Sequence, residues 1–294
     1  MQVQQDFNLS DADFKLVQDV VHKHCGIALS DEKKALVRAR LTKQIRLGGF
    51  ASAKTYLDHV LSDRGEAAFA EFIDAISTNL TSFFREPQHF SFLTENVLPR
   101  LFTEKRAKGD GRLMAWSAAC SSGEEPYSLA MTILESIAKL PQGSVRWDVR
   151  LLATDISTRM LAAARAGIYS RDRLKGVSPA NLAQYFSLPT GARSGEEQCE
   201  VSSALRNVIR FRHLNLMDSW PFNGPFDFIF CRNVMIYFDR QTQQELVDRF
   251  WNCLRPGGYL FTGHSESLTG TNHRFTSRRP SIYEKPQGAV AEAA

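Results

Sequence analysis

The sequence has few cysteines and none in a pattern typical of metal sites or disulfide frameworks. There are five in 294 residues, an odd number, and no two of them have C-x-x-C spacing. We therefore predict reduced thiols and no metal site. No apolar run approaches the roughly 18 residues that a membrane-spanning helix needs. The opening segment MQVQQDFNLSDADF lacks a basic stretch followed by an apolar one, so we expect no secretory signal and a cytoplasmic location.

Neither sign of charge is in large excess. Lys and Arg number 36 against 32 Asp and Glu, a net charge of +4. Proteins that bind nucleic acid usually concentrate far more positive charge on one face. Hydrophobic residues make up 43% and charged residues 23%, which excludes a mainly disordered chain. The length suits one large domain or two ordinary ones.

Strand patterns are also lacking in the first part of the chain, where apolar residues recur at helical spacing. Ser10 followed by Asp13 predicts an N-cap, and Phe14 begins the apolar face of the first helix. A second helix is predicted from Ser30 to residue 47, ended by the following glycine pair. Further helical segments are predicted over 56–61 and 69–76. We therefore predict a small helical domain over residues 1–78.

From about residue 110, apolar strands alternate with helices. Such alternation predicts a parallel, doubly wound sheet with its ligand at the carboxyl ends of the strands. The alternation breaks between Ile168 and Leu216, where a polar turn and the alternating segment Val208 to His213 predict a small antiparallel insertion. The Ala-rich tail after Pro286 is expected to be frayed. Strands are predicted over 112–118, 149–154, 226–231 and 259–262, and helices from Pro126, over 158–166 and over 242–254.

The dinucleotide fingerprint G-x-G-x-x-G is absent from the loop after the first strand. This loop, AACSSGEEPYSLA, contains small residues and only one glycine, Gly123. Its small side chains let a ligand approach the backbone, but Glu124 and Glu125 would repel a phosphate and favour an ammonium group. The pattern favours a nucleoside ligand without phosphates. The alternative is an ordinary tight turn before an acidic first helical turn.

Three other segments place polar residues beside this loop. Asp155 ends the second strand, where an acid can bind both ribose hydroxyls, although it could instead cap the next helix in competition with Ser157. Asn215 and Leu216 follow a later strand, which weakly suggests contact with adenine. The segment CRNVMIYF leaves the strand FDFIFC at its carboxyl end. The segment NLTSFFRE, which begins at Asn79, joins the two domains, or is simply an amphipathic linker.

Taken together, five segments resemble the CheR-type chemotaxis receptor methyltransferases in order and spacing. The resemblance spans roughly residues 10 to 285 and implies a Rossmann-like methyltransferase domain behind a small all-α domain. The implied methyltransferase domain covers 79–286, with a linker at 79–95, an inserted antiparallel β-subdomain at about 168–214, and a disordered tail at 287–294. The segments are NLTSFFRE, AACSSGEEPYS, ATDIS, CRNVMIYF and LRPGGYLFTGHSES.

The resemblance also implies a reaction and a set of site residues. S-Adenosylmethionine would donate its methyl group to a glutamate side chain in the coiled-coil region of a receptor, giving a methyl ester and S-adenosylhomocysteine. Arg85 and Tyr237 would stand at the methyl group. Glu125 would face the methionine ammonium and Asp155 the ribose. The implied cofactor-binding residues are Asn79, Thr81, Arg85, Glu125, Asp155, Asn215 and Leu216, with Arg232 and Asn233 beside the adenine.

Two surfaces are candidates for contact with the receptor. Between Lys33 and Arg46 there are six basic residues and no acid. Arg38 and Arg46 share one helix face, with Lys43 beside it, and could dock an acidic receptor helix or simply be a solvated face. Some members of the family hold a tail peptide of the receptor on the β-subdomain. The turn from Gly191 to Gly195 and the basic segment from Arg206 to Arg212 would provide such a tether.

Two other functions remain as alternatives. A nucleic-acid methyltransferase that modifies amino groups needs an N-P-P-[YF]-like motif where this chain has CRNVMIYF, and a cytosine-C5 enzyme needs a Pro-Cys nucleophile that the sequence lacks. A non-enzymatic adaptor that binds S-adenosylmethionine would be indicated by loss of Arg85 or Tyr237, and both are present. A glutamate acceptor, with a pKa of about 4.3, is ionised at neutral pH and needs no general base.

Overall fold

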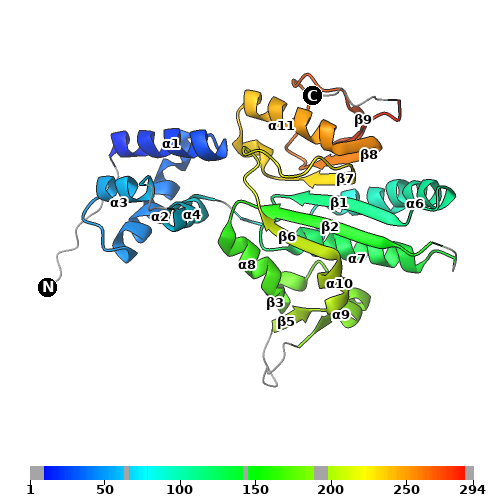
Figure 1. The fold of residues 1–294 in the computed structure, drawn as a ribbon. Coiled ribbons are helices and arrows are strands. Elements are labelled where there is room, and N and C mark those ends of the chain that lie inside the picture. Colours follow the sequence, from blue (N-terminus) through cyan, green and yellow to red (C-terminus); the bar gives the residue numbers. More distant parts are fainter. Residues whose placement is uncertain (1–9, 63–65, 78, 142–144, 189–197, 289–294) are drawn as a thin grey trace.

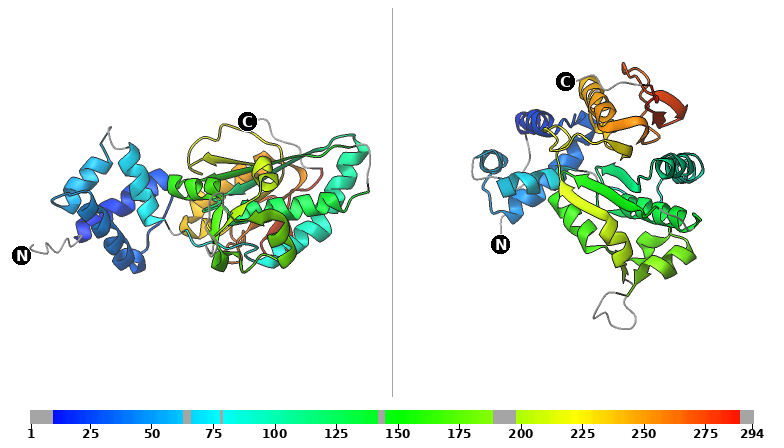
Figure 2. Two further views of the ribbon diagram at one scale, coloured as in Figure 1. Left: turned by 90° about the horizontal axis from the view of Figure 1, so that it is seen from below. Right: turned by 45° about the vertical axis from the view of Figure 1, so that its right-hand side comes forward.

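The computed structural model describes residues 10–62, 66–77, 79–141, 145–188 and 198–288. A small helical domain lies beside a larger α/β domain, at the end of the sheet to which the strand arrows of β1 and β2 point (Figure 1). The views in Figure 2 show the same arrangement from two other sides. None of the helices in these ranges is both long and apolar enough to cross a membrane.

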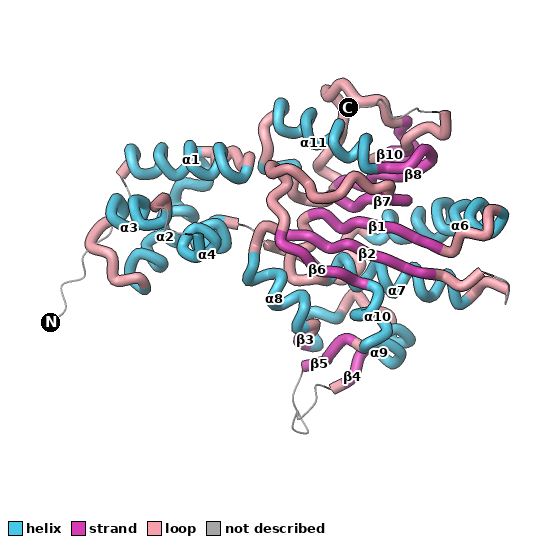
Figure 3. Tube along the Cα trace, viewed as in Figure 1, coloured by secondary structure: helices cyan, strands magenta, loops and turns pink. Residues whose placement is uncertain are grey.

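The helical domain follows the pattern of its sequence. Ser10 caps the first helix by accepting a hydrogen bond from the Asp13 N–H, and the Asp13 carboxylate accepts one from the Ser10 N–H. Phe14 and the other predicted apolar residues of this helix are buried in one core with the neighbouring helices. Figure 3 shows helices and loops throughout the described part of this domain. The elements are α1 (Asp11–Cys25), the 3-10 turn η1 (Asp31–Lys33), α2 (Lys34–Leu47), α3 (Ala53–Val60) and α4 (Glu66–Ile76).

The α/β domain is built on a seven-stranded sheet with the order β6-β2-β1-β7-β8-β10-β9. The first five of these strands are parallel, four of them as predicted, and β10 and β9 continue the sheet antiparallel. The sequence prediction missed these last two, which are only three and four residues long. The strands are β1 (Arg112–Ala118), β2 (Asp148–Asp155), β6 (Ile209–His213), β7 (Phe226–Cys231), β8 (Leu254–Thr262), β9 (Thr276–Arg279) and β10 (Ile282–Glu284).

Helices cover both faces of this sheet. On one face, Phe230 packs in a core with the helical segment that follows the linker and with α7. On the other face, Trp116 packs against Phe250 of α11. Helix α7 begins at Glu124, two residues before the predicted start, because Gly123 takes a left-handed conformation (φ 98°) as its N-cap. The helices are α5 (Pro87–Phe92), the π-helical η2 (Leu93–Val97), α6 (Leu98–Ala107), α7 (Glu124–Ala138), α8 (Thr158–Ala166) and α11 (Arg240–Cys253).

An antiparallel insertion follows α8, as predicted, but it does not include the last predicted strand. The prediction that Val208–His213 belongs to the insertion is wrong, because β6 pairs in parallel with β2 at the edge of the main sheet. Its alternating pattern arises because Ile209 and Phe211 are buried while the arginines between and after them are exposed. The inserted three-stranded sheet has the order β3-β5-β4. Its elements are β3 (Ile168–Ser170), η3 (Arg171–Leu174), α9 (Pro179–Tyr185), β4 (Phe186–Ser187) and β5 (Gln198–Val201), followed by α10 (Ser203–Val208).

The peptide tether therefore loses one of the two features on which its prediction rested. Arg206 lies on α10, and the basic strand after it belongs to the main sheet. The turn from Gly191 to Gly195 lies outside the described residues, as does most of the predicted disordered tail.

Candidate active site

The site lies at the carboxyl ends of β1, β2 and β7, next to the helical domain. The loop after β1 turns sharply: Ala119, Ser121 and Gly123 all have positive φ. A Cβ atom on Gly123 would lie 2.8 Å from the Tyr169 hydroxyl oxygen and 2.9 Å from the Ala164 Cβ, so the close packing here requires glycine. Small residues and this turn bring the loop backbone beside the end of β2.

Asp155 is buried at the end of β2 and lines the pocket described below. Its carboxylate accepts hydrogen bonds from the N–H groups of Ser121, at 2.7 Å, and Ser157, at 2.8 Å. Burial raises the pKa of Asp155 to about 6, although these two hydrogen bonds act in the opposite direction. Ser157, not Asp155, caps α8, through a hydrogen bond from the Met160 N–H. The capping alternative for Asp155 is thereby removed.

Glu125, in the first turn of α7, forms a second acidic group in the same pocket. Its carboxylate accepts a hydrogen bond from the Ser117 hydroxyl at 2.7 Å and pairs with the Arg232 guanidinium at 3.2 Å. Burial raises the pKa of Glu125, and the charge of Arg232 partly opposes that shift. The neighbouring Glu124 is fully buried and pairs with Arg173 instead. Of the two acids in the motif, only Glu125 lines the pocket.

One pocket collects most of the predicted site residues. It encloses about 1030 Å³ of empty space, part of it open to solvent, and is lined by both domains and by the linker. A smaller adjoining pocket contains Asn215 and Leu216 and shares Asp155 with the first. Arg232 and Asn233 line the larger pocket with Glu125, not the smaller one. The predicted residues in the larger pocket are Asn79, Thr81, Arg85, Glu125, Asp155, Arg232, Asn233 and Tyr237.

The helical domain closes the pocket on one side through contacts with the segment after β7. The Ala28 N–H donates to the Tyr237 carbonyl oxygen at 2.7 Å, next to an antiparallel bridge between Ile27 and Phe238. Asn215 donates to the carbonyl oxygen of His24 at 2.6 Å. The linker is held as well, since the Ser121 hydroxyl donates to the carbonyl oxygen of Asn79 at 3.1 Å. Residues from all three parts of the chain are thereby fixed around one space.

Glu266, which the sequence interpretation did not single out, shapes the loop that carries Asn233 and Tyr237. Its buried carboxylate accepts hydrogen bonds from the N–H groups of Asn233 and Gly263, both at 2.6 Å, and of Ile236, at 3.1 Å. Asn233 takes a left-handed conformation (φ 59°), and Met235–Tyr237 form a 3-10 turn, η4. One signal in the sequence could have identified Glu266: it is an acidic residue shortly after a strand, at the same sheet edge as the other site residues.

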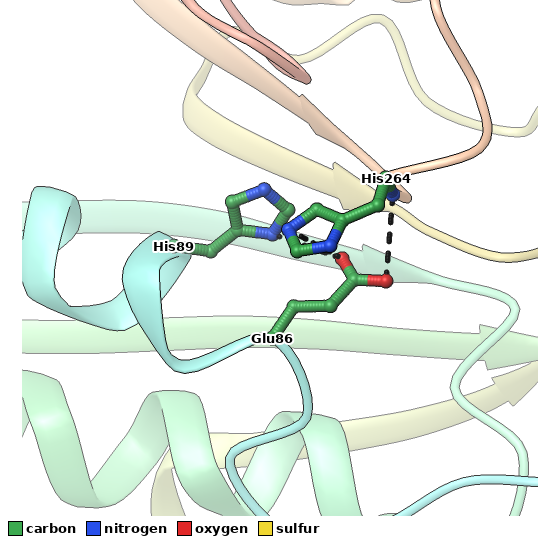
Figure 4. A group of neighbouring side chains, drawn as sticks. All are labelled: Glu86, His89 and His264. Atoms are coloured by element: carbon green, nitrogen blue, oxygen red, sulfur yellow. Dashed lines mark hydrogen bonds and ion pairs between the residues drawn. The ribbon is translucent and has the colours of Figure 1, made fainter.

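Glu86, His89 and His264 form a cluster (Figure 4), and Glu86 also pairs with Arg232. The His89 Nδ1 atom is 3.4 Å and the His264 Nε2 atom 3.8 Å from the Glu86 Oε2 atom. These are zinc-ligand types, but the Arg232 guanidinium lies 3.0 Å from the same Glu86 oxygen. A divalent cation there would adjoin a buried positive charge. We therefore interpret Glu86 as part of an ion-pair network with Arg232 and Glu125. Burial lowers the pKa of His89 to about 3 and keeps its imidazole neutral beside that network.

Comparison with known proteins agrees with this arrangement of two domains. Residues 79–283 match the family model described as the CheR methyltransferase SAM-binding domain, and residues 12–77 match its all-alpha domain. The chain belongs to the CheR methyltransferase family. It is 40% identical over 284 residues to the chemotaxis protein methyltransferase of Escherichia coli K12, covering 96% of this chain and 94% of that protein. It is 41% identical over 270 residues to a probable chemotaxis protein methyltransferase of Rhizobium etli, covering 88% and 98% of the two chains.

Membership in the CheR family establishes S-adenosylmethionine as the cofactor, and the pocket has the chemistry to bind it. Two carboxylates, Glu125 and Asp155, line the pocket and would repel a pyrophosphate, which suits a ligand with an ammonium group, a ribose and no phosphate. Asp155 retains acceptor positions beyond the two filled by backbone N–H groups, because an ionised carboxylate has about four. The chain is thus a methyltransferase of the CheR family that uses S-adenosylmethionine.

Proposed function

We propose that this CheR-family enzyme methylates glutamate side chains of methyl-accepting chemotaxis receptors, forming glutamate methyl esters for sensory adaptation. The observation that supports this most is the composition of the pocket around Tyr237. Three cations line it with Tyr237: Arg232, which is paired with Glu86 and Glu125, and Arg85 and Lys33. The described residues that line this pocket include no histidine, and His89 is fully buried beside Glu86. An acceptor that is already ionised at neutral pH suits such a site.

The chain's own residues would then bind and orient, and exclude water. When bound, S-adenosylmethionine supplies an electrophilic methyl group on its sulfonium. We assign the ammonium group to Glu125, the ribose to Asp155, and the adenine to the smaller pocket with Asn215 and Leu216. Asn79 and Thr81 complete the pocket from the linker. Arg85 and Tyr237 hold the acceptor carboxylate in line, and the main contribution to rate is alignment in a closed pocket.

The test is transfer of labelled methyl to receptor-containing membranes. We expect the label to appear on the receptors and to be released by mild base, as methyl esters are. Receptors in which the acceptor glutamates are replaced by alanine provide the control and should remain unlabelled. Label that resists mild base, or that appears on nucleic acid instead, would contradict the proposed acceptor.

Asp155 provides a pH-dependent test of the cofactor assignment. Its pKa of about 6 in the protein without ligand means that it becomes protonated as the pH falls from 7.5 to 5. If the ionised form binds the ribose, the affinity for S-adenosylhomocysteine should fall about tenfold at pH 5. The Asp155→Asn variant should bind more weakly at neutral pH and lose this contribution to the pH dependence. Calorimetry at several pH values measures both effects, and identical profiles for the two proteins would remove Asp155 from the site.

Receptor docking is proposed to use exposed basic residues of α2. Lys43 and Arg46 are exposed, and Lys43 lines a shallow pocket with Arg40, Arg159 and other residues. Arg38 is different, because its guanidinium donates to the Asp11 carboxylate at 2.9 Å. Its charge is therefore partly neutralised within the domain, and Lys43 and Arg46 are the more informative positions.

Reversing the charge of both Lys43 and Arg46 to Glu should lower receptor methylation about tenfold at low salt, because attraction to an acidic helix is lost. Affinity for S-adenosylhomocysteine should not change. Reversing Arg106 and Lys108 to Glu, two exposed residues at the far end of α6, makes the same change in net charge and is the control. Methylation rates equal to the wild type at low salt, where electrostatic attraction is strongest, would argue for a merely solvated face.

A further inference from the structure

Lys33 of the helical domain reaches the same pocket as the methyltransferase residues. Its ammonium nitrogen lies 4.4 Å from the centroid of the Tyr237 ring. The side chain is half-buried and lines the pocket together with Leu36, one turn further along the chain, and Leu80 of the linker. These two leucines are 47% and 79% exposed and form an apolar rim beside the cation. Lys33 therefore lies where a ligand entering the pocket from solvent would meet it.

The positive charge of Lys33 is not neutralised by a carboxylate in the described parts of the chain. Its neighbour Lys34 pairs with Asp11 at 2.5 Å. In the pocket itself, Arg232 is committed to Glu86 and Glu125. A single contact with an aromatic face is weak, about 0.5–1 kcal/mol at exposed sites, so an entering anion readily displaces it.

The pocket is divided into an acidic wall and a basic wall. Glu125, which is paired with Arg232, and Asp155 line the side formed by the sheet, and Lys33 lines the side formed by the helical domain. An acceptor carboxylate is repelled by the first wall and attracted by the second. Tyr237 stands beside Lys33 and also belongs to the segment that carries Arg232 and Asn233. A carboxylate held by Lys33 is therefore adjacent to the group assigned to the methyl position.

We infer that Lys33 is a substrate-binding residue that receives the carboxylate of the acceptor glutamate and guides it to Tyr237 and Arg85. This inference rests on the proposed function. The attraction acts on the ionised acceptor and is lost once the neutral ester has formed. Lys33 therefore favours binding of the unmethylated receptor and release of the methylated one, and its removal acts on KM more than on kcat.

The experiment compares Lys33→Met with Lys34→Met, which removes the same charge from the neighbouring position outside the pocket. For Lys33→Met we expect the KM for the unmethylated receptor to rise roughly tenfold, kcat to stay within a few-fold, and the affinity for S-adenosylhomocysteine to stay unchanged. For Lys34→Met, we expect KM, kcat and the affinity for S-adenosylhomocysteine all to stay within about twofold of the wild-type values. Lys33→Arg should restore most of the affinity for the receptor. The KM defect should persist at high salt, because a local contact is screened much less than long-range attraction.

Several outcomes would overturn the inference. They are an unchanged KM for Lys33→Met, an equal defect in Lys34→Met, a defect that disappears at high salt, or a parallel loss of affinity for S-adenosylhomocysteine. If the wild type methylates receptor glutamates normally and any of these results is found, only the role of Lys33 is contradicted. A wild-type enzyme that forms no base-labile ester on any receptor overturns the proposed function, and this inference with it.

Discussion

Replacing Arg232 with alanine is expected to lower the free energy of unfolding by about 3–5 kcal/mol, because it leaves two largely buried carboxylates without their shared cation. The Arg232 side chain is 1% exposed and pairs with Glu86 at 3.0 Å and Glu125 at 3.2 Å. It also donates to the carbonyl oxygen of Arg85, so the linker loses an anchor as well. Urea denaturation measures the effect as a lower midpoint at an unchanged slope.

The sign of the pH dependence follows from Glu86. Burial alone would raise its pKa, but Arg232 and the hydrogen bonds from Asn233 and His264 lower it below the ordinary value. A carboxylate with a lowered pKa stabilises the fold above its pKa in the unfolded chain, and this stability is lost as the pH falls through the folded pKa. The deficit of the Arg232→Ala variant should therefore be largest at neutral pH. It should shrink below about pH 5, where both carboxylates can take up protons.

Two comparisons separate this effect from general loss of charge. Arg150 is 59% exposed and pairs with Asp148. Replacing it with alanine should lower the free energy of unfolding by less than about 1 kcal/mol. Adding Glu125→Gln to Arg232→Ala should recover part of the loss, because one of the two uncompensated charges is removed. A loss below about 1 kcal/mol for Arg232→Ala would mean that water or a relaxed structure compensates the carboxylates, and the buried network would then carry little stability.

The sequence predicted the positions of the strands better than it predicted their partners. The runs RLMAWSA and FDFIFC coincide with β1 and β7 because strands buried on both faces are apolar throughout. The strand β6 was assigned to the wrong sheet because one of its faces is exposed, and an edge strand of a parallel sheet then has the same alternating pattern as an antiparallel strand. Its sheet could be known only from its pairing with β2.

The candidate site shows the same limit. Asp155 and Glu125 could be singled out because the carboxyl ends of parallel strands meet at one edge, whatever the details of packing. The ion-pair partners of Arg232 could not be predicted from the sequence, because Glu86 precedes Arg232 by 146 residues and Glu125 precedes it by 107. Lys33 was counted among the basic residues of a docking surface. Its position over Tyr237 depends on how the helical domain packs on the methyltransferase domain, for which the local pattern contains no signal.

Replacing Arg85 with alanine is expected to reduce turnover by about a hundredfold or more, the range found when one preorganised electrostatic group is lost. Arg85 is half-buried and lines the pocket with Tyr237, and one of its donors holds the Leu80 carbonyl oxygen at 2.8 Å. That bond restrains the guanidinium, and its remaining donors are available to a ligand in the pocket. A fixed, planar guanidinium can orient a carboxylate through two parallel hydrogen bonds.

Cofactor affinity is the measurement that decides what Arg85 does. Binding of S-adenosylhomocysteine should change only a few-fold in Arg85→Ala, because its charged groups are assigned to Glu125 and Asp155. The turnover of Arg85→Lys should fall between those of Arg85→Ala and the wild type, because lysine keeps the positive charge but lacks the paired donors of the guanidinium. With no proton to exchange, kcat of the wild type should be nearly flat from about pH 7 to 9. Methyl transfer and calorimetry on the same Arg85→Ala sample test the assignment. If turnover survives within a few-fold while affinity collapses, Arg85 holds the cofactor and some other group, with Lys33 the nearest cation over Tyr237, must orient the acceptor.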